Sequence, residues 1–128
     1  MTITSSGFAK TAEAYLQKLN NCFTEEIFHS VENFARDLRK AWVDGRQVFI
    51  CGNGGSAANA IHLANDLHYG IGACGPSPQI PGLRVDALPA NTGIITCIAN
   101  DTGYENIYSH QLEVKGRSGD LLIVLSGS

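Results

Sequence analysis

Apolar and polar residues follow a helical spacing over the first third of the chain. Residues 8–20 have the pattern of a moderately amphipathic helix, and residues 24–43 that of a longer one, with apolar side chains recurring every three or four positions. Thr24 is suited to cap the second helix, and Gly45 is suited to end it. The pattern predicts two N-terminal helices whose apolar faces pack in a core or against another subunit.

The pattern changes after Gly45 to short, continuous apolar runs. Three such runs predict strands that are buried on both faces, at residues 48–51, 83–88 and 121–125. The segments between them predict helices at 57–67, 93–99 and 105–114, and a Gly- and Pro-rich loop at 70–82. Because strands that alternate with helices form parallel crossovers, we expect an open, flavodoxin-like α/β sheet with helices on both faces.

The 128 residues are enough for one domain. We expect a single domain over residues 1–128, with a helical part at about 8–44 and an α/β part at 47–128. The third predicted strand is followed only by Ser126, Gly127 and Ser128, which resemble the start of a further turn. We therefore expect the domain to be incomplete at its C-terminus, truncated after the third strand.

The segment around Gly52 combines a buried strand, a glycine-rich turn and a helix. Gly54 and Gly55 tolerate positive φ and close backbone approach, and Ser56 is suited to cap the helix. The unpaired amides and the positive end of the helix dipole at such a corner bind anions. Ligands of open α/β sheets bind at the carboxyl ends of strands. The sequence therefore predicts a phosphate site at this corner.

Composition narrows the class of protein. Hydrophobic residues make up 44% of the chain and charged residues 16%, as in a folded globular protein, and the net charge of −3 gives no reason to expect nucleic acid as a partner. The four cysteines form no C-x-x-C pair, which favours reduced thiols. Neither a secretory signal nor a membrane-spanning apolar run is present, so we expect a cytoplasmic protein. Lys115 and Arg117 have the pattern of solvated charges at a turn.

Two segments carry a family resemblance. They read GNGGSAANAIHLANDL, from Gly52 to Leu67, and IANDTGYENIYSHQLEVKGRSGDLLIVLSGS, from Ile98 to Ser128. From about residue 24 to the last residue the chain resembles the sugar isomerase (SIS) domain and, within it, the bacterial phosphoheptose isomerases. The resemblance implies a parallel-sheet α/β sandwich, usually tetrameric, that binds zinc. It also implies the interconversion of sedoheptulose 7-phosphate and a glycero-manno-heptose 7-phosphate.

The resemblance assigns roles to residues of both segments. It implies substrate binding at four places, namely Asn53, Gly54, Gly55 and Ser56; Asp66; Asn100 and Asp101; and Ser126, Gly127 and Ser128. It further implies that His62 and Asp66 bind zinc and that Asp66 is a catalytic acid–base group. Three departures bear on this. Asp66 stands where glutamate is usual, Gly127 replaces a threonine, and the family's distal glutamine and histidine, a metal ligand and a base, would lie beyond Ser128.

The chemistry of aldose–ketose isomerisation agrees with these assignments. A proton moves between adjacent carbons through an enediol, which requires an acid and a base. His62 and Asp66 are four residues apart on a predicted helix, so their side chains lie on one face and can share a metal or hold a proton. The alternative for His62 is a hydrogen-bonded helix histidine, because zinc takes three or four ligands. Asn100 and Asp101 can equally serve to turn the chain.

Two other functions stay open at this stage. One is a noncatalytic SIS protein that senses phosphosugars or associates with a replication initiator, although a pure scaffold needs neither His62 nor Asp66. The other is a dinucleotide-binding fragment, since a G-x-G-x-x-A pattern starts at Gly52. That fingerprint expects an acid at the following strand end, whereas Asp86 lies inside its strand.

Overall fold

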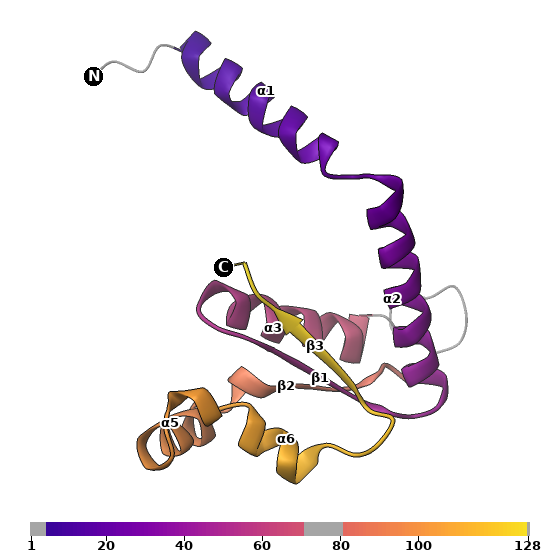
Figure 1. The fold of residues 1–128 in the computed structure, drawn as a ribbon, viewed down its shortest axis with the longest axis vertical. Coiled ribbons are helices and arrows are strands. Elements are labelled where there is room, and N and C mark those ends of the chain that lie inside the picture. The colour runs from indigo at the N-terminus through magenta and orange to yellow at the C-terminus, as the bar shows by residue number, and fades with distance from the viewer. Residues whose placement is uncertain (1–4, 71–80, 128) are drawn as a thin grey trace. The chain divides into compact units, whose positions relative to one another are not determined.

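A computed structural model of the chain describes residues 5–70 and 81–127 (Figure 1). The chain divides into two compact units, Met1–Asp37 and Leu38–Ser128. Most of the loop predicted at residues 70–82 lies outside the described residues. No helix in the described part of the chain combines the length and apolarity needed to cross a lipid bilayer.

The first unit is helical. It holds α1 (Ser5–Asn21) and the start of α2 (Glu25–Val43). The backbone N–H of Ile27 donates to Thr24 Oγ1 over 3.3 Å, which confirms the predicted cap. Among the described residues of this unit nine large apolar side chains are exposed, namely Phe8, Tyr15, Leu16, Leu19, Phe23, Ile27, Phe28, Val31 and Phe34. The two predicted helices are confirmed, and much of their apolar surface is uncovered in the single chain.

The second unit is built on three parallel strands. They are β1 (Gln47–Gly52), β2 (Arg84–Ala87) and β3 (Leu121–Leu125), in the order β2-β1-β3. The strands predicted at 48–51 and 121–125 are confirmed. Burial on both faces holds for β1 and is wrong for β3, where Leu122 and Val124 on one face are 45% and 61% exposed. The strand predicted at 83–88 is shorter, because Leu88 begins a short 3-10 turn in which Pro89 has no N–H to give to a ladder.

The helices of the second unit differ in detail from those predicted. They are α3 (Gly55–Asn65), α5 (Thr92–Asp101) and α6 (Ser109–Lys115), with 3-10 turns at Leu88–Ala90 and Tyr104–Asn106 and a π-helical turn at Asp66–Gly70. Asn91, just before the predicted helix at 93–99, caps α5 by accepting the Ile94 N–H over 3.1 Å. The single helix predicted at 105–114 is wrong, since the chain forms a 3-10 turn first and starts α6 only at Ser109.

Alternate residues of β1 pack on opposite faces of the sheet. Val48 and Ile50 are fully buried in a cluster with residues of α3 and the end of α2. Phe49 and Cys51 are buried on the other face, where Tyr108, just before α6, and Leu112, within α6, pack against them. Figure 1 shows α3 on one side of the strands and α6 on the other. The predicted α/β sheet with helices on both faces is therefore confirmed.

Candidate functional site

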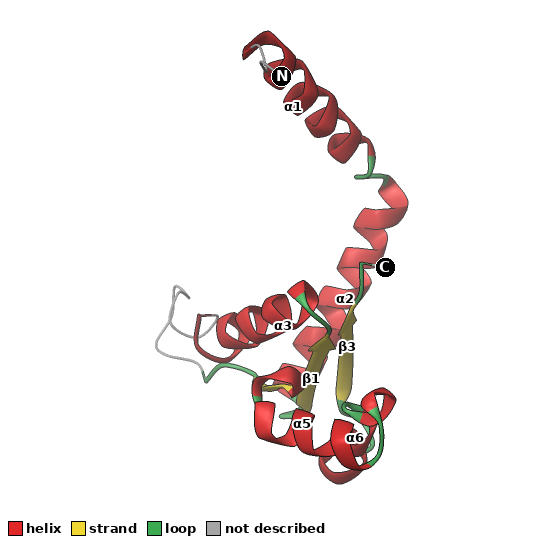
Figure 2. Cartoon of the chain, turned by 90° about the vertical axis from the view of Figure 1, so that its left-hand side faces the viewer, coloured by secondary structure: helices red, strands yellow, loops and turns green. Residues whose placement is uncertain are grey.

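Two loops leave the carboxyl edge of the sheet side by side. The register pairs Cys51 with Val124 and Gly52 with Leu125, so Asn53 and Ser126 follow directly after paired residues. Figure 2 shows β1 and β3 adjacent and running in one direction. The strand order also reverses at β1, because the chain passes through α3 to β2 and then returns past β1 to β3. Open α/β sheets bind ligands at such a switch point.

Gly52 allows the two loops to approach each other. A Cβ atom at this position would lie 2.7 Å from Ser56 Cβ and 2.8 Å from the Leu125 carbonyl oxygen. Any larger residue would push α3 away from β1, or β1 away from β3. The glycine therefore sets the geometry of the corner.

The helix after this corner begins earlier than predicted. Gly54 occupies the N-cap position with φ 56° and ψ −122°, and no side chain caps α3. The carbonyl oxygens of Asn53 and Gly54 accept the N–H groups of Ser56 (3.0 Å) and Ala57 (3.1 Å). Ser56 thus lies inside the first turn, and its predicted role as cap is wrong. Within the described residues the N–H groups of Gly54 and Gly55 donate no hydrogen bond, so both are available to an anion at the positive end of α3.

Tyr108 is part of this corner and was not expected from the sequence. Its hydroxyl lies 2.5 Å from the Gly52 carbonyl oxygen and 3.1 Å from Asn53 Oδ1. Burial raises the pKa of the Tyr108 phenol above its usual value, so the group stays protonated and donates. The contact joins positions 56 residues apart, and the sequence pattern around Tyr108 does not predict it.

The side chains of His62 and Asp66 lie on one face of the helix, as predicted, but away from the Asn53 corner. His62 Nε2 is 3.5 Å from Asp66 Oδ2, and the side chains are 79% and 57% exposed. Asp66 comes eleven residues after Gly55 (66 − 55), a distance of roughly 16 Å along a helix that rises 1.5 Å per residue. In residues 5–70 and 81–127 no three His, Cys, Asp or Glu side chains gather as a metal site.

Asn100 and Asp101 make local contacts at the end of α5. Asp101 accepts hydrogen bonds from Asn100 Nδ2 over 2.8 Å and from Cys97 Sγ over 3.5 Å, and its proximity raises the pKa of the Cys97 thiol. No hydrogen bond found among the described residues links Asn100 or Asp101 to Asn53 or Ser126. Gly127 is exposed after β3, and Ser128 lies outside the described residues.

Sequence comparison decides the family. Residues 8–128 match the SIS domain. The chain belongs to the SIS domain family. The match covers nearly all of the chain, which confirms the resemblance seen in the two quoted segments.

Relatives of this SIS domain include several phosphoheptose isomerases. That of Akkermansia muciniphila is 41% identical over 100 residues, which cover 77% of this chain and 49% of the relative. Phosphoheptose isomerase 2 of Campylobacter jejuni is 33% identical over 117 residues, covering 91% and 56%. The structure of phosphoheptose isomerase from Neisseria gonorrhoeae aligns with a TM-score of 0.70 and 29% identity, over 97% of this chain and 59% of that one. The chain spans about half the length of the relatives it matches.

Proposed function

We propose that this SIS domain acts in a phosphoheptose isomerase that converts sedoheptulose 7-phosphate into an aldoheptose 7-phosphate through an enediol. Its relatives in sequence and structure carry that name. One structural observation supports the proposal most strongly: the register of β1 and β3 sets the Asn53 and Ser126 corners side by side at the switch point.

The adjacent corners suit the phosphate end of the substrate. The N–H groups of Gly54 and Gly55 offer two donors at the positive end of α3. The hydroxyls of Ser126 and Ser128 would add donors from the second corner, and the Asn53 amide would contact a sugar hydroxyl. In this proposal Asn100 and Asp101 also bind substrate, after a change in their local contacts.

Asp66 is the proposed acid–base group, and its position calls for a second copy of the chain. Roughly 16 Å of helix separates Asp66 from the corner of its own chain, more than the span from the phosphate to C1 of a seven-carbon sugar. We infer that Asp66 of one copy serves the corner of another. The exposed apolar side chains of α1 and α2 offer surface for such an assembly, and the tetramer implied by the family resemblance stays a prediction.

Zinc is part of the same proposal. His62 and Asp66 supply nitrogen and oxygen donors of the kind zinc prefers, and their 3.5 Å separation lets both reach one ion. They fit two positions of a coordination sphere, and further ligands would have to come from outside this pair. A bound zinc ion would polarise a substrate oxygen. Asp66, which is exposed, would hold or move the proton.

The proposal is tested by giving the protein sedoheptulose 7-phosphate and following the product by NMR. We expect turnover that is lost in Asp66→Ala and in Ser126→Asp, which places a negative charge at the phosphate corner. Mixing these two inactive variants under subunit exchange should restore activity, because one copy supplies Asp66 and the other the intact corner. Glu113→Ala, at an exposed position outside α1 and α2, is the control. Absence of turnover by the intact protein would contradict the catalytic proposal.

A second candidate is a noncatalytic SIS protein that binds phosphosugars. The distance between Asp66 and its own corner favours this role for a chain that does not assemble. Isothermal titration with a heptose phosphate and with NAD at equal concentration separates the candidates. Binding of the sugar phosphate without turnover supports the sensor, and binding of NAD alone supports a dinucleotide site. A cytoplasmic location and the absence of a nucleic-acid partner stay predictions.

A further inference from the structure

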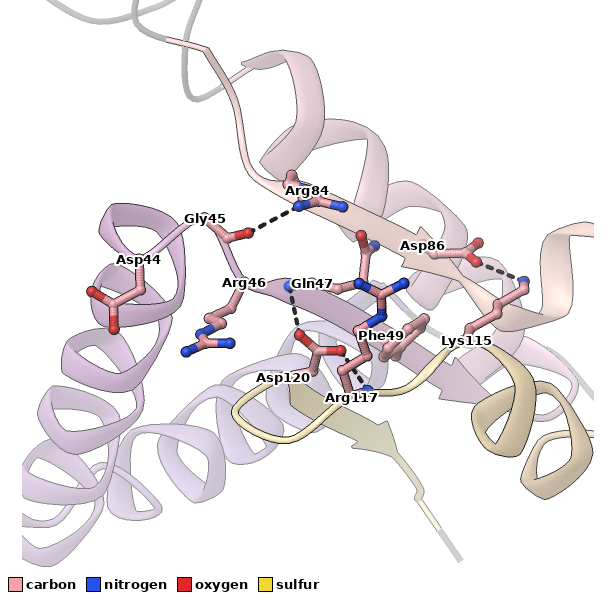
Figure 3. A pocket seen from close by; sticks show the side chains of 10 residues that line it. All are labelled: Asp44, Gly45, Arg46, Gln47, Phe49, Arg84, Asp86, Lys115, Arg117 and Asp120. Carbon is pink, nitrogen blue, oxygen red and sulfur yellow. Dashed lines mark hydrogen bonds and ion pairs between the residues drawn. The ribbon is translucent and has the colours of Figure 1, made fainter.

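A polar cavity of about 350 Å³ lies at the amino edge of the sheet, at the opposite end of β1 from the corner (Figure 3). Four cationic and three acidic side chains line it, together with Gly45, Gln47 and Phe49. β1 has six residues, so roughly 20 Å separates Gln47 in this cavity from Asn53 at the corner, at about 3.3 Å per residue. The cavity is therefore distinct from the site proposed above.

The carboxylates of the cavity already have partners. Asp44 Oδ2 is 2.6 Å from Lys40 Nζ, and this pairing lowers the pKa of the Asp44 carboxyl. Asp86 Oδ2 is 2.7 Å from Lys115 Nζ, which corrects the expectation that Lys115 is merely solvated. Asp120 accepts two backbone N–H groups, at 3.0 and 2.8 Å. Two of the three acids are thus paired with lysines, Asp120 keeps its charge, and none of the three forms an ion pair with an arginine within the described residues.

The arginines of the cavity are anchored without being neutralised. Arg84 Nη1 donates to the Gly45 carbonyl oxygen over 3.2 Å, and Arg46 Nη1 donates to that of Ser118 over 3.3 Å. A guanidinium has five N–H donors, so each keeps donors for a ligand. The Arg117 guanidinium makes no hydrogen bond or ion pair within the described residues. Arg46 helps to lower the pKa of Asp44 through space, but the two form no ion pair there.

The register places the Arg84 side chain on the face of the sheet that α6 covers. Arg84 is the register partner of Gln47, and Asp86 that of Phe49, so these side chains share the face that α6 covers. Figure 3 shows Arg84 and Arg117 on either side of Gln47, with the Arg117 side chain passing over Phe49. Phe49 is 2% exposed and gives the site a rigid wall.

We propose that Arg84 and Arg117 bind the phosphate group of a small molecule in this cavity, with the Gln47 amide as a further donor and Arg46 at the rim. Guanidinium and phosphate match in geometry, since parallel N–H groups meet two oxygens. The net charge of the chain is −3, so the site depends on its local cations and not on overall attraction. The ligand is either inorganic phosphate or a phosphomonoester.

NMR titration of the isotope-labelled protein tests this proposal. The probes are sodium phosphate and, in a second arm, glycerol 3-phosphate, each added at constant ionic strength against sodium chloride. We expect saturable shifts at the Nε–H groups of Arg84 and Arg117, reported separately from any shifts at the Gly54 and Gly55 amides. In the double variant Arg84→Gln/Arg117→Gln, affinity at this site should fall roughly tenfold or more, as for the loss of charge-assisted hydrogen bonds.

Arg36→Gln is the matched control, because it removes one positive charge from an exposed position outside the cavity. It should leave the affinity unchanged. A stronger response to glycerol 3-phosphate assigns the site to phosphomonoesters, and an equal response assigns it to phosphate itself. Shifts that chloride reproduces, or that persist in a folded double variant, would overturn the proposal.

Discussion

The hydroxyl of Tyr108 lies 2.5 Å from the carbonyl oxygen of Gly52, two positions that are 56 residues apart in the sequence. Tyr108 immediately precedes α6, and Gly52 ends β1. The hydrogen bond therefore ties the helix layer on one face of the sheet to the corner at which the proposed substrate binds.

We expect Tyr108→Phe to lower the free energy of unfolding by about 1 kcal/mol, the usual net contribution of one hydrogen bond. The ring would remain packed on Phe49 and Cys51, so the effect reports the hydroxyl. Urea denaturation measures it. Tyr104→Phe is the control, because that ring is 60% exposed and its hydroxyl makes no hydrogen bond in the described part of the chain. Equal effects of both variants would contradict the role of Tyr108.

Gly52→Ala should destabilise the protein by about 1–3 kcal/mol, the range observed when atoms are added to a packed site. The added methyl group would lie within 3 Å of Ser56 Cβ and of the Leu125 carbonyl oxygen. Thermal unfolding measures the loss. Gly55→Ala is the matched control, since a Cβ there meets nothing within 4 Å. If Gly52→Ala proves as stable as Gly55→Ala, the close approach of the two loops is wrong.

Val48→Ala should cost about 2 kcal/mol, because it removes two methyl groups from a fully buried position of the central strand. The same substitution at Val124, which is 61% exposed on β3, should change stability by less than about 0.5 kcal/mol. Denaturant unfolding measures the free energy of unfolding of both variants, and so compares the same substitution at a buried and at an exposed position. A similar cost at both positions would argue against β1 as the centre of the core.

Stability should fall as the pH rises above about 9. Burial raises the pKa of the Cys51 thiol above its ordinary value of 9.0, so the folded protein keeps a proton that the unfolded chain releases. Above that pH, ionisation of the thiol in the unfolded chain lowers the free energy of unfolding. In Cys51→Ala the free energy of unfolding should fall less steeply with pH than in the wild type, between pH 9 and the onset of global alkaline unfolding. Cys22→Ala, at an exposed thiol, should follow the wild type.

Elements encoded by local patterns were predictable from the sequence. The apolar runs at 48–51 and 121–125 became strands, and Thr24 and Asn91 became caps, because each depends on residues within one turn. Ser56 was misjudged as a cap, since the positive φ of Gly54 lets α3 start two residues earlier than Ala57. The adjacency of the Asn53 and Ser126 corners depends on the strand order β2-β1-β3, which only the structure supplies.

Contacts that depend on register were not predictable. The Tyr108 hydrogen bonds to Gly52 and Asn53, and the Lys115–Asp86 ion pair, join side chains that only the folded sheet brings together. The residues that line the cavity at the amino edge are likewise brought together only by the folded sheet. One arginine in a strand and one in a distant turn gave no sign that Arg84 and Arg117 would line one cavity.

The register of β1 and β3 also has a consequence for the order of folding. The pairing at the start of these strands joins residues 73 positions apart, whereas the β1–β2 pairing joins Gln47 to Arg84, about half as far along the chain. Distant pairings pay the larger loop-closure entropy and tend to form late. The Asn53 and Ser126 corners then become adjacent only when β3 pairs with β1. A sugar phosphate bound to both corners would stabilise this late-forming pairing.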